Sequence, residues 1–389
     1  MPNRNIQRLF ASRALRGFAD GLVTVLLAKH LAQIGLSEFQ IGSVITGTLL
    51  GSAAMTLLAG VWASRWGYRR VLLIASVLMG LTGVGFYVAT SYWPLLAIAV
   101  IGTLNPSAGD VSMFLPTEQT ALSEAASDRT FAFARYNVFG NLAGALGSLA
   151  SGPLDRFTPG TSGRSAFLIY AAIGLTTALL YRGLPETTAR SVARVPLRKS
   201  RRVVLRLALL FSLDSAGGGF VVQSLLALWL FQRFGLSIAQ TGAVFFGTGV
   251  LAAFSQLLSS RVARRIGLIP TMVAAHLPAN ALLVLAAFMP NAPLAITLLL
   301  LRMCIAQMDV PARQAYVMNV VPPEERAAAA SVTNVPRSLA TATTPLLAGW
   351  LLSKTSFGWP LVLGGSLKIL YDLLLLWQFK SHRPEHEDR

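Results

Sequence analysis

The sequence predicts an all-α membrane protein in which twelve transmembrane helices form two pseudo-symmetric bundles of six. Of the 389 residues, 54% are hydrophobic and only 13% are charged, whereas a soluble domain carries about 25% charged residues. The apolar residues fall into blocks of roughly 20, and a helix of that length spans about 30 Å, the thickness of a bilayer core. The two halves of the chain also share short motifs in the same order.

The apolar blocks predict the individual spans. From the N-terminus they cover residues 10–34, 40–63, 69–90, 93–122, 129–153, 164–184, 203–233, 238–262, 267–289, 292–320, 326–352 and 358–380. Alternate links between them are rich in arginine, as at Arg65, Arg69 and Arg70, and positive loops stay on the cytoplasmic side. Both termini are therefore expected in the cytoplasm, and the Ala- and Arg-rich composition favours a bacterial inner membrane.

The distribution of charge along the chain indicates its partner, and a polar segment near the middle indicates where its two domains meet. The net charge of +17 is spread over short links between apolar blocks, so the expected partner is the lipid bilayer and not nucleic acid. Residues 185–202 form a long polar, basic stretch. This predicts a cytoplasmic linker between an N-terminal bundle, 1–184, and a C-terminal bundle with a short tail, 203–389. The single cysteine, Cys304, allows no disulfide, and no cofactor is expected.

An internal repeat relates the two halves. Gly35-Leu36-Ser37 recurs as Gly235-Leu236-Ser237, and Arg65-Trp66-Gly67 recurs as Arg265-Ile266-Gly267, each pair 200 residues apart. Asp110 and Asn137 likewise have counterparts in Asp309 and Asn334. A parallel duplication of six spans predicts two bundles related by an axis along the membrane normal, with a central cavity between them.

The segment Gly-Val-Trp-Ala-Ser-Arg-Trp-Gly-Tyr-Arg-Arg, residues 60–70, resembles the signature of the major facilitator superfamily between its second and third helices. The resemblance implies a secondary transporter that works by alternating access. It also implies gating roles for the residues of the motif: Gly60, Ser64, Arg65, Gly67, Arg69 and Arg70. Ser64 stands where the family has an acidic residue, so the usual gate latch is expected to be absent or relocated.

A second pattern lies on the fifth span, where Gly140, Gly144 and Gly147 precede Gly152-Pro153. It partly matches a glycine-proline signature that the superfamily associates with antiporters, which slightly favours export. The alternative is that small residues let two helices approach closely in lipid.

Charged residues within spans are the candidate site, because each costs several kcal/mol unless it faces a cavity or a partner. In the superfamily, the first, fourth, seventh and tenth helices line the cavity, and here they carry Asp20, Asp110, Asp214 and Asp309. Asp20 and Asp110 are the expected proton-coupling residues, with Arg135 as a counter-charge. The expected substrate-binding residues are Asp214, Arg302, Asp309, Arg337, Asn137 and Asn334.

Local pairing and helix breakers refine this site. Proline and polar residues interrupt the fourth span at 105–110 and the tenth span at 307–314, which predicts a binding and hinge region or, alternatively, simple kinks. Asp309 with Arg313, and Lys368 with Asp372, have i,i+4 spacing and are expected to pair. His276 stands alone on the ninth span and is expected to be packed or solvated and not to act as a ligand.

Together these features predict proton-coupled efflux of a small molecule by a monomeric transporter. Proton-coupled uptake of a small organic anion is the alternative, favoured by Arg302 and Arg337. A non-transporting membrane sensor on the same fold is an alternative of another class. No phosphate loop is present, so ATP-driven transport within this chain is not expected. No nucleophile motif or other catalytic constellation is present, so an enzyme is not expected.

Overall fold

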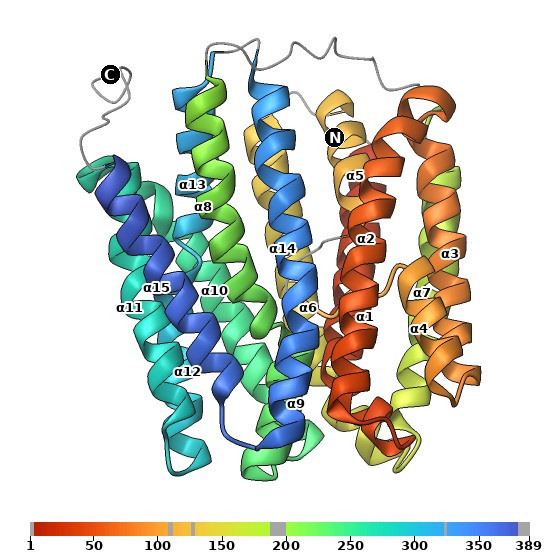
Figure 1. Cartoon of the computed structure of the whole chain (residues 1–389). Helices are drawn as coiled ribbons and strands as arrows, with labels where there is room; N and C mark the ends of the chain where they lie inside the picture. The colour runs from red at the N-terminus through yellow and green to blue at the C-terminus, as the bar shows by residue number, and fades with distance from the viewer. Residues whose placement is uncertain (1–3, 108–111, 126–128, 187–199, 323–324, 380–389) are drawn as a thin grey trace. The chain divides into compact units, whose positions relative to one another are not determined.

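The computed structural model describes residues 4–107, 112–125, 129–186, 200–322 and 325–379. Within these ranges the chain forms fifteen α-helices and no strand (Figure 1). Nine of the predicted spans are single helices: α1 (Arg4–Gln33), α2 (Glu38–Trp66), α3 (Tyr68–Val88), α6 (Arg129–Phe157), α7 (Ser162–Arg182), α10 (Ile238–Ile266), α11 (Leu268–Ala287), α14 (Arg326–Lys354) and α15 (Trp359–Phe379).

The other three spans are each broken into two helices. They are the fourth, α4 (Tyr92–Ile101) and α5 (Phe114–Ala125); the seventh, α8 (Arg201–Phe220) and α9 (Gln223–Phe234); and the tenth, α12 (Ala292–Ala306) and α13 (Asp309–Val320). The predicted architecture of twelve spans is therefore confirmed, and so are the breaks in the fourth and tenth spans. The break in the seventh was not predicted. Three consecutive glycines, 217–219, precede it, and glycine is a weak helix former.

The helices have the apolar surface that a bilayer requires. Eight helical stretches in the described part of the chain are long and apolar enough to cross a membrane. Large apolar side chains point outward, for example Leu209, Leu81 and Trp377, which are 75%, 63% and 78% exposed. A soluble protein rarely exposes so many large apolar side chains together, so lipid is the solvent for these surfaces.

The internal repeat is visible in the backbone. Gly35 and Gly235 both have positive φ, 89° and 64°, and so do Gly67 and Gly267, with 81° and 89°. A residue with a Cβ rarely adopts this conformation, which explains why glycine ends the helix at each of these positions in both halves.

The repeat extends to the helix caps that follow. The Ser37 amide donates to Gln40 Oε1 at 2.9 Å, and the Gln40 amide donates to Ser37 Oγ at 3.3 Å. Ser237 and Gln240 form the same reciprocal pair at 2.8 and 3.1 Å. Such a capping box satisfies backbone donors that the first turn of a helix leaves unpaired. Both halves therefore start their second span in the same way.

The described helices belong to two compact units. One comprises residues 1–191 with 222–249, and the other 192–221 with 250–389. The first unit thus includes α9 and the first part of α10, so the chain passes from one unit to the other at the break in the seventh span. The predicted halves, 1–184 and 203–389, divide the chain by its repeat instead, and they stay a prediction.

In the first unit, the interrupted backbone of the fourth span is satisfied by α9. The Pro106 carbonyl accepts hydrogen bonds from the Ser224 amide and hydroxyl, both at 3.2 Å. The same hydroxyl is 3.0 Å from the carbonyl oxygen of Thr24 on α1. Irregular backbone is tolerated at membrane depth only where protein or water satisfies it, so this contact stabilises the break.

Glycines let α1 and α6 pack closely in the first unit. A Cβ added to Gly21 would lie 1.9 Å from the Gly144 carbonyl oxygen, and one added to Gly17 would lie 2.5 Å from that of Gly140. The glycines of the fifth span are therefore accounted for by close helix packing.

The Gly21→Ala variant is expected to lose about 1–3 kcal/mol of stability, because an added methyl group overlaps backbone that cannot rotate away. Gly80→Ala is the matched control, since its Cβ would meet Ala171 and Leu175 at an ordinary 3.7 Å. Thermal unfolding of both variants in detergent checks this. Equal midpoints for the two variants would contradict the close approach of α1 and α6.

Candidate functional site

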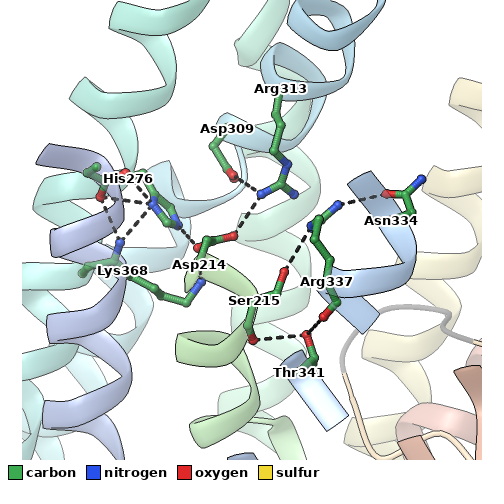
Figure 2. A network of polar contacts seen from close by, with 11 residues as sticks. Asp214, Ser215, His276, Asp309, Arg313, Asn334, Arg337, Thr341 and Lys368 are labelled. Carbon is green, nitrogen blue, oxygen red and sulfur yellow. Dashed lines mark hydrogen bonds and ion pairs between the residues drawn. The ribbon is translucent and has the colours of Figure 1, made fainter. Parts of the chain in front are cut away.

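The second unit contains a buried network of charged side chains centred on Asp214 of α8. Lys368 Nζ from α15 lies 2.6 Å from Asp214 Oδ1, and Arg313 Nη1 from α13 lies 3.0 Å from Asp214 Oδ2. The three residues are only 4%, 8% and 6% exposed. Figure 2 shows the carboxylate lying between the two basic groups, which approach it from different helices. Ions this far from water require such partners.

Arg313 links Asp214 to a second carboxylate. Its Nη1 atom is also 3.2 Å from Asp309 Oδ2, one turn earlier on α13, so the predicted i,i+4 pair is confirmed. Asp309 is the first residue of α13, where a negative charge is favoured by the helix dipole. Because the break in the tenth span makes Asp309 the first residue of α13, it places this carboxylate at a helix N-terminus, where the helix dipole stabilises it.

His276 of α11 is the member of the network that the sequence did not identify. Its Nδ1 atom lies 2.9 Å from Asp372 Oδ1, and its Nε2 atom lies 3.6 Å from Asp214 Oδ1. Asn280 Nδ2, one turn further along α11, donates to Asp372 Oδ2 at 3.4 Å. His276 is packed, with 5% of its surface exposed, and both of its ring nitrogens also face carboxylates, which the sequence did not predict.

The predicted pair of Lys368 with Asp372 is also wrong. Lys368 reaches across to Asp214, and Asp372 pairs with His276. The i,i+4 rule describes neighbours on an isolated helix, whereas α15 packs against α8 and α11, and these helices supply partners of their own.

Two arginines of this unit have no acidic partner in the described part of the chain. Arg337 of α14 donates from Nε to Ser215 Oγ at 3.1 Å and from Nη1 to Asn334 Oδ1 at 3.3 Å, both neutral acceptors. Arg302 of α12 forms no hydrogen bond or ion pair with the described residues, and its Nε atom is buried without an acceptor. Asn334, another predicted site residue, thus orients Arg337.

The first unit has its own buried ion pair, between Arg16 of α1 and Glu118 of α5. Glu118 is fully buried and Arg16 is 2% exposed. The Glu118 carboxylate also accepts hydrogen bonds from Tyr136 of α6, Tyr181 of α7 and Ser12 of α1, the last two at 2.5 and 2.8 Å. No local pattern pointed to this cluster, because its members lie on four helices far apart in the sequence.

The other predicted site residues of this unit lie on α1 and α6 or outside the described residues. Asp20 lies on α1 beside the break in the fourth span, where Asn105 Nδ2 is 3.4 Å from Asp20 Oδ2. Arg135 and Asn137 lie on α6 and are exposed. Asp110 lies outside the described residues. The proton-coupling assignment of Asp20, Asp110 and Arg135 stays a prediction.

The motif at 60–70 forms the turn between α2 and α3. Gly67 precedes the first turn of α3 with φ of 81°. Arg69 Nη1 lies 3.1 Å from Glu186 Oε1, just after α7, while Arg65 and Arg70 are exposed. Gly60 and Ser64 lie in α2, but their side chains are outside the described part. Glu186 therefore provides an acidic partner for this loop. The ion pair is exposed, so it contributes at most about 1 kcal/mol to stability.

Two bundles of apolar helices with buried charged networks and paired helix breaks define a membrane transporter. The family model of the Major Facilitator Superfamily matches residues 9–306 and 209–389, and the chain belongs to this family. It is thus an integral membrane protein and a transporter rather than an enzyme, with the fold of secondary transporters.

Two relatives illustrate the breadth of the family. The chain is 25% identical over 422 residues to the uncharacterized membrane protein YJR124C of Saccharomyces cerevisiae, covering 97% of this chain and 94% of that protein. It is 26% identical over 103 residues to the D-xylose transporter of Levilactobacillus brevis, covering 26% of this chain and 22% of that protein.

Solved structures share the fold. The nucleoside transporter NupG superimposes with a TM-score of 0.76 at 15% identity, covering 97% of this chain and 99% of that chain. A bacterial homolog of the human lysosomal transporter Spinster also gives 0.76, at 16% identity, covering 96% and 95% of the two chains. At this identity the likeness concerns the fold alone.

Proposed function

We propose that the chain is a proton-coupled secondary transporter of a small organic anion. The observation that supports this most strongly is Arg337, whose guanidinium is held by Ser215 and Asn334 and meets no carboxylate among the described residues. A cation within a membrane span costs several kcal/mol unless a partner compensates it. An anionic substrate group would be that partner, and Arg302 adds a second uncompensated cation in the same unit.

The carboxylates of this unit support an anion over a cation as substrate. Asp214 and Asp309 were expected to bind substrate, but Lys368 and Arg313 already compensate them at 2.6 to 3.2 Å. A cationic substrate would have to displace a buried ammonium or guanidinium group. We therefore assign Asp214 and Asp309 to holding the network, and Arg337 and Arg302 to binding the substrate.

Export by proton exchange is the second candidate. It rests on Asp20 beside the break in the fourth span, with Asp110 and Arg135 as its proposed companions in proton coupling. Of the glycines that favoured export, Gly140, Gly144 and Gly147 pack against α1 and Gly152 packs against Ala239 of α10, so helix packing accounts for them and they support no direction. Flux in proteoliposomes with a pH gradient of either sign decides between uptake and export.

We further propose a monomer in a bacterial inner membrane, with both termini in the cytoplasm. The arginines at 65, 69 and 70 in one half and at 261, 264 and 265 in the other support this orientation. A reporter fused after residue 389 that is active only outside the cytoplasm should stay inactive. An active reporter would reverse the orientation.

Anion binding predicts stabilisation of the purified protein. The probes are acetate, lactate, succinate, benzoate and inorganic phosphate, with tetraphenylphosphonium as the cation. A ligand at 100 times its dissociation constant adds about 2.7 kcal/mol to the folded state. We expect at least one anion to raise the unfolding midpoint in detergent, and Arg337→Gln to weaken its binding about tenfold or more, since a charge-assisted hydrogen bond contributes about 1.5–3 kcal/mol.

Arg206→Gln is the matched control. Arg206 lies on α8, is exposed and is not part of the network, so this variant loses the same charge as Arg337→Gln without changing the proposed site. It should bind the anion like the parent. Stabilisation by tetraphenylphosphonium alone, or equal anion binding by the Arg337→Gln and parent proteins, would contradict an anion site at Arg337.

A further inference from the structure

The His276 imidazole lies between two buried carboxylates. It is 5% exposed, and its edge-on contact with the Tyr371 ring, at 5.9 Å between centroids, fixes one side of the ring. Nδ1 faces Asp372 at 2.9 Å and Nε2 faces Asp214 at 3.6 Å. The side chain therefore bridges α8 and α15, which both carry groups of the charged network.

This geometry gives the imidazole a partner in both protonation states. Asn280 Nδ2, an amide donor, lies 3.1 Å from Nδ1, so a neutral ring can accept a hydrogen bond there. An imidazolium has two donors and matches both sides. Nδ1 is at hydrogen-bonding distance from Asp372, whereas Nε2 interacts with Asp214 through charge alone.

The charge balance of the network favours the protonated ring. Among the described residues, three carboxylates of the network, Asp214, Asp309 and Asp372, face two permanently basic side chains, Lys368 and Arg313. The helices around His276 carry further ionisable groups outside these ion pairs: Tyr371 on α15, Tyr316 on α13, Arg302 and Cys304 on α12, Arg337 on α14 with Arg326 and Lys354 at its ends, and Arg201, Arg202 and Arg206 in the first turns of α8. One proton on His276 makes the ion-paired core neutral.

The charge of this core decides how strongly the neighbouring arginines attract an anion. Ser215, which accepts a hydrogen bond from Arg337, is the next residue after Asp214 on α8. Without the proton, the core carries one excess negative charge and opposes an anion at Arg337 and Arg302. With the proton, that opposition is removed, so proton and anion each favour the binding of the other.

We infer that His276 is the residue that binds the transported proton in the second unit, and that this proton travels in the same direction as an anion held at Arg337 and Arg302. This inference rests on the proposed function for its substrate, but the proton site at His276 stands on its own geometry. The inference assigns proton binding to His276 on the ninth span instead of Asp20 on the first, although the ninth span was not expected to line the cavity. It also implies that proton and anion move in the same direction, as in a symporter, and not in opposite directions.

Protonation of His276 is measurable without any substrate. The probe is protein labelled with ¹⁵N-histidine, in vesicles of phosphatidylethanolamine and phosphatidylglycerol, observed by solid-state NMR from about pH 5 to about pH 8. The signal that disappears in His276→Gln identifies this side chain. We expect it to show an imidazolium with both nitrogens protonated within this range. A neutral imidazole throughout the range would overturn the inference, whatever the substrate.

Coupling to the anion is measured by proton uptake in weakly buffered detergent solution. Adding the most stabilising anion of the panel should cause proton uptake by the parent, and about tenfold less by His276→Gln, whose anion affinity should fall about tenfold. Equal proton uptake by both proteins would overturn the assignment. If no anion stabilises the parent, the proposed anion substrate fails, while the NMR titration still decides the proton site.

Asp372→Asn gives a second variant if His276→Gln does not fold. It keeps the imidazole and replaces the carboxylate that faces Nδ1 by a neutral group of the same shape. The imidazolium population of His276 at about pH 7 should fall in this variant. An unchanged population would show that Asp372 does not hold the proton on the ring.

Discussion

The Asp214→Asn variant is expected to lose transport by about 100-fold or more and stability by about 3–5 kcal/mol. The substitution keeps the shape of the side chain but removes the charge that Lys368 and Arg313 share at 2.6 and 3.0 Å. Removing one partner of a buried ion pair leaves an uncompensated buried charge, and this is the costly step. Flux in proteoliposomes and thermal unfolding in detergent measure the two losses.

Two further variants isolate the cause. Asp155→Asn is the control, because Asp155 lies at the end of α6 and accepts a hydrogen bond from Ser162 at 2.8 Å, which asparagine also accepts. Its stability should change by less than about 0.5 kcal/mol. The double variant Asp214→Asn with Lys368→Gln restores the charge balance and should recover part of the stability but not the transport. A double variant no more stable than the single one would refute the charge-balance account.

The Glu118→Gln variant should show the largest loss of stability in the first unit, again about 3–5 kcal/mol. Glu118 forms an ion pair with Arg16, and both side chains are buried. Its carboxylate also accepts the Tyr136 and Tyr181 hydroxyl hydrogens. A glutamine keeps one acceptor oxygen and presents an amide donor to a site filled with donors. Thermal unfolding in detergent measures the loss.

Glu124→Gln on the same helix is the matched control, because Glu124 is exposed and its neutralisation should change stability by less than about 0.5 kcal/mol. Replacing both members of the buried pair, with Arg16→Met and Glu118→Met, should recover most of the loss, since two apolar side chains remove both buried charges. If Glu118→Gln unfolds at the same temperature as Glu124→Gln, the buried pair does not stabilise the bundle.

The two ion pairs reveal how far the internal repeat extends. In each half, the first helix is tied to the second part of a broken span: α1 to α5 by Arg16 and Glu118, and α8 to α13 by Asp214 and Arg313. The signs are reversed, because the first helix supplies the base in one half and the acid in the other. The duplication thus preserves which helices are joined, while the residues that join them have diverged. Arg302 and Arg337, for which we propose anion binding, and His276 lie in the second half.

Features encoded by neighbouring residues were predictable from the sequence. Apolar blocks of bilayer length determined the twelve spans, and prolines beside polar residues located the breaks in the fourth and tenth spans. The shared glycines, such as Gly35 and Gly235, marked positive φ in both halves. The pair of Asp309 with Arg313 followed from helical spacing alone. In each case the physical cause lies within about one helical turn of the residue concerned.

Only the tertiary structure decided which partner each buried charge has. Lys368 is one turn from Asp372 in the sequence, yet it pairs with Asp214, and Asp372 pairs with His276. Glu118 collects partners from three other helices. A buried ion takes the opposite charge that packing brings nearest, since desolvation makes an unpaired state costly. Sequence spacing determines neighbours along one helix, whereas the helices that face each other are determined by how all their surfaces pack together.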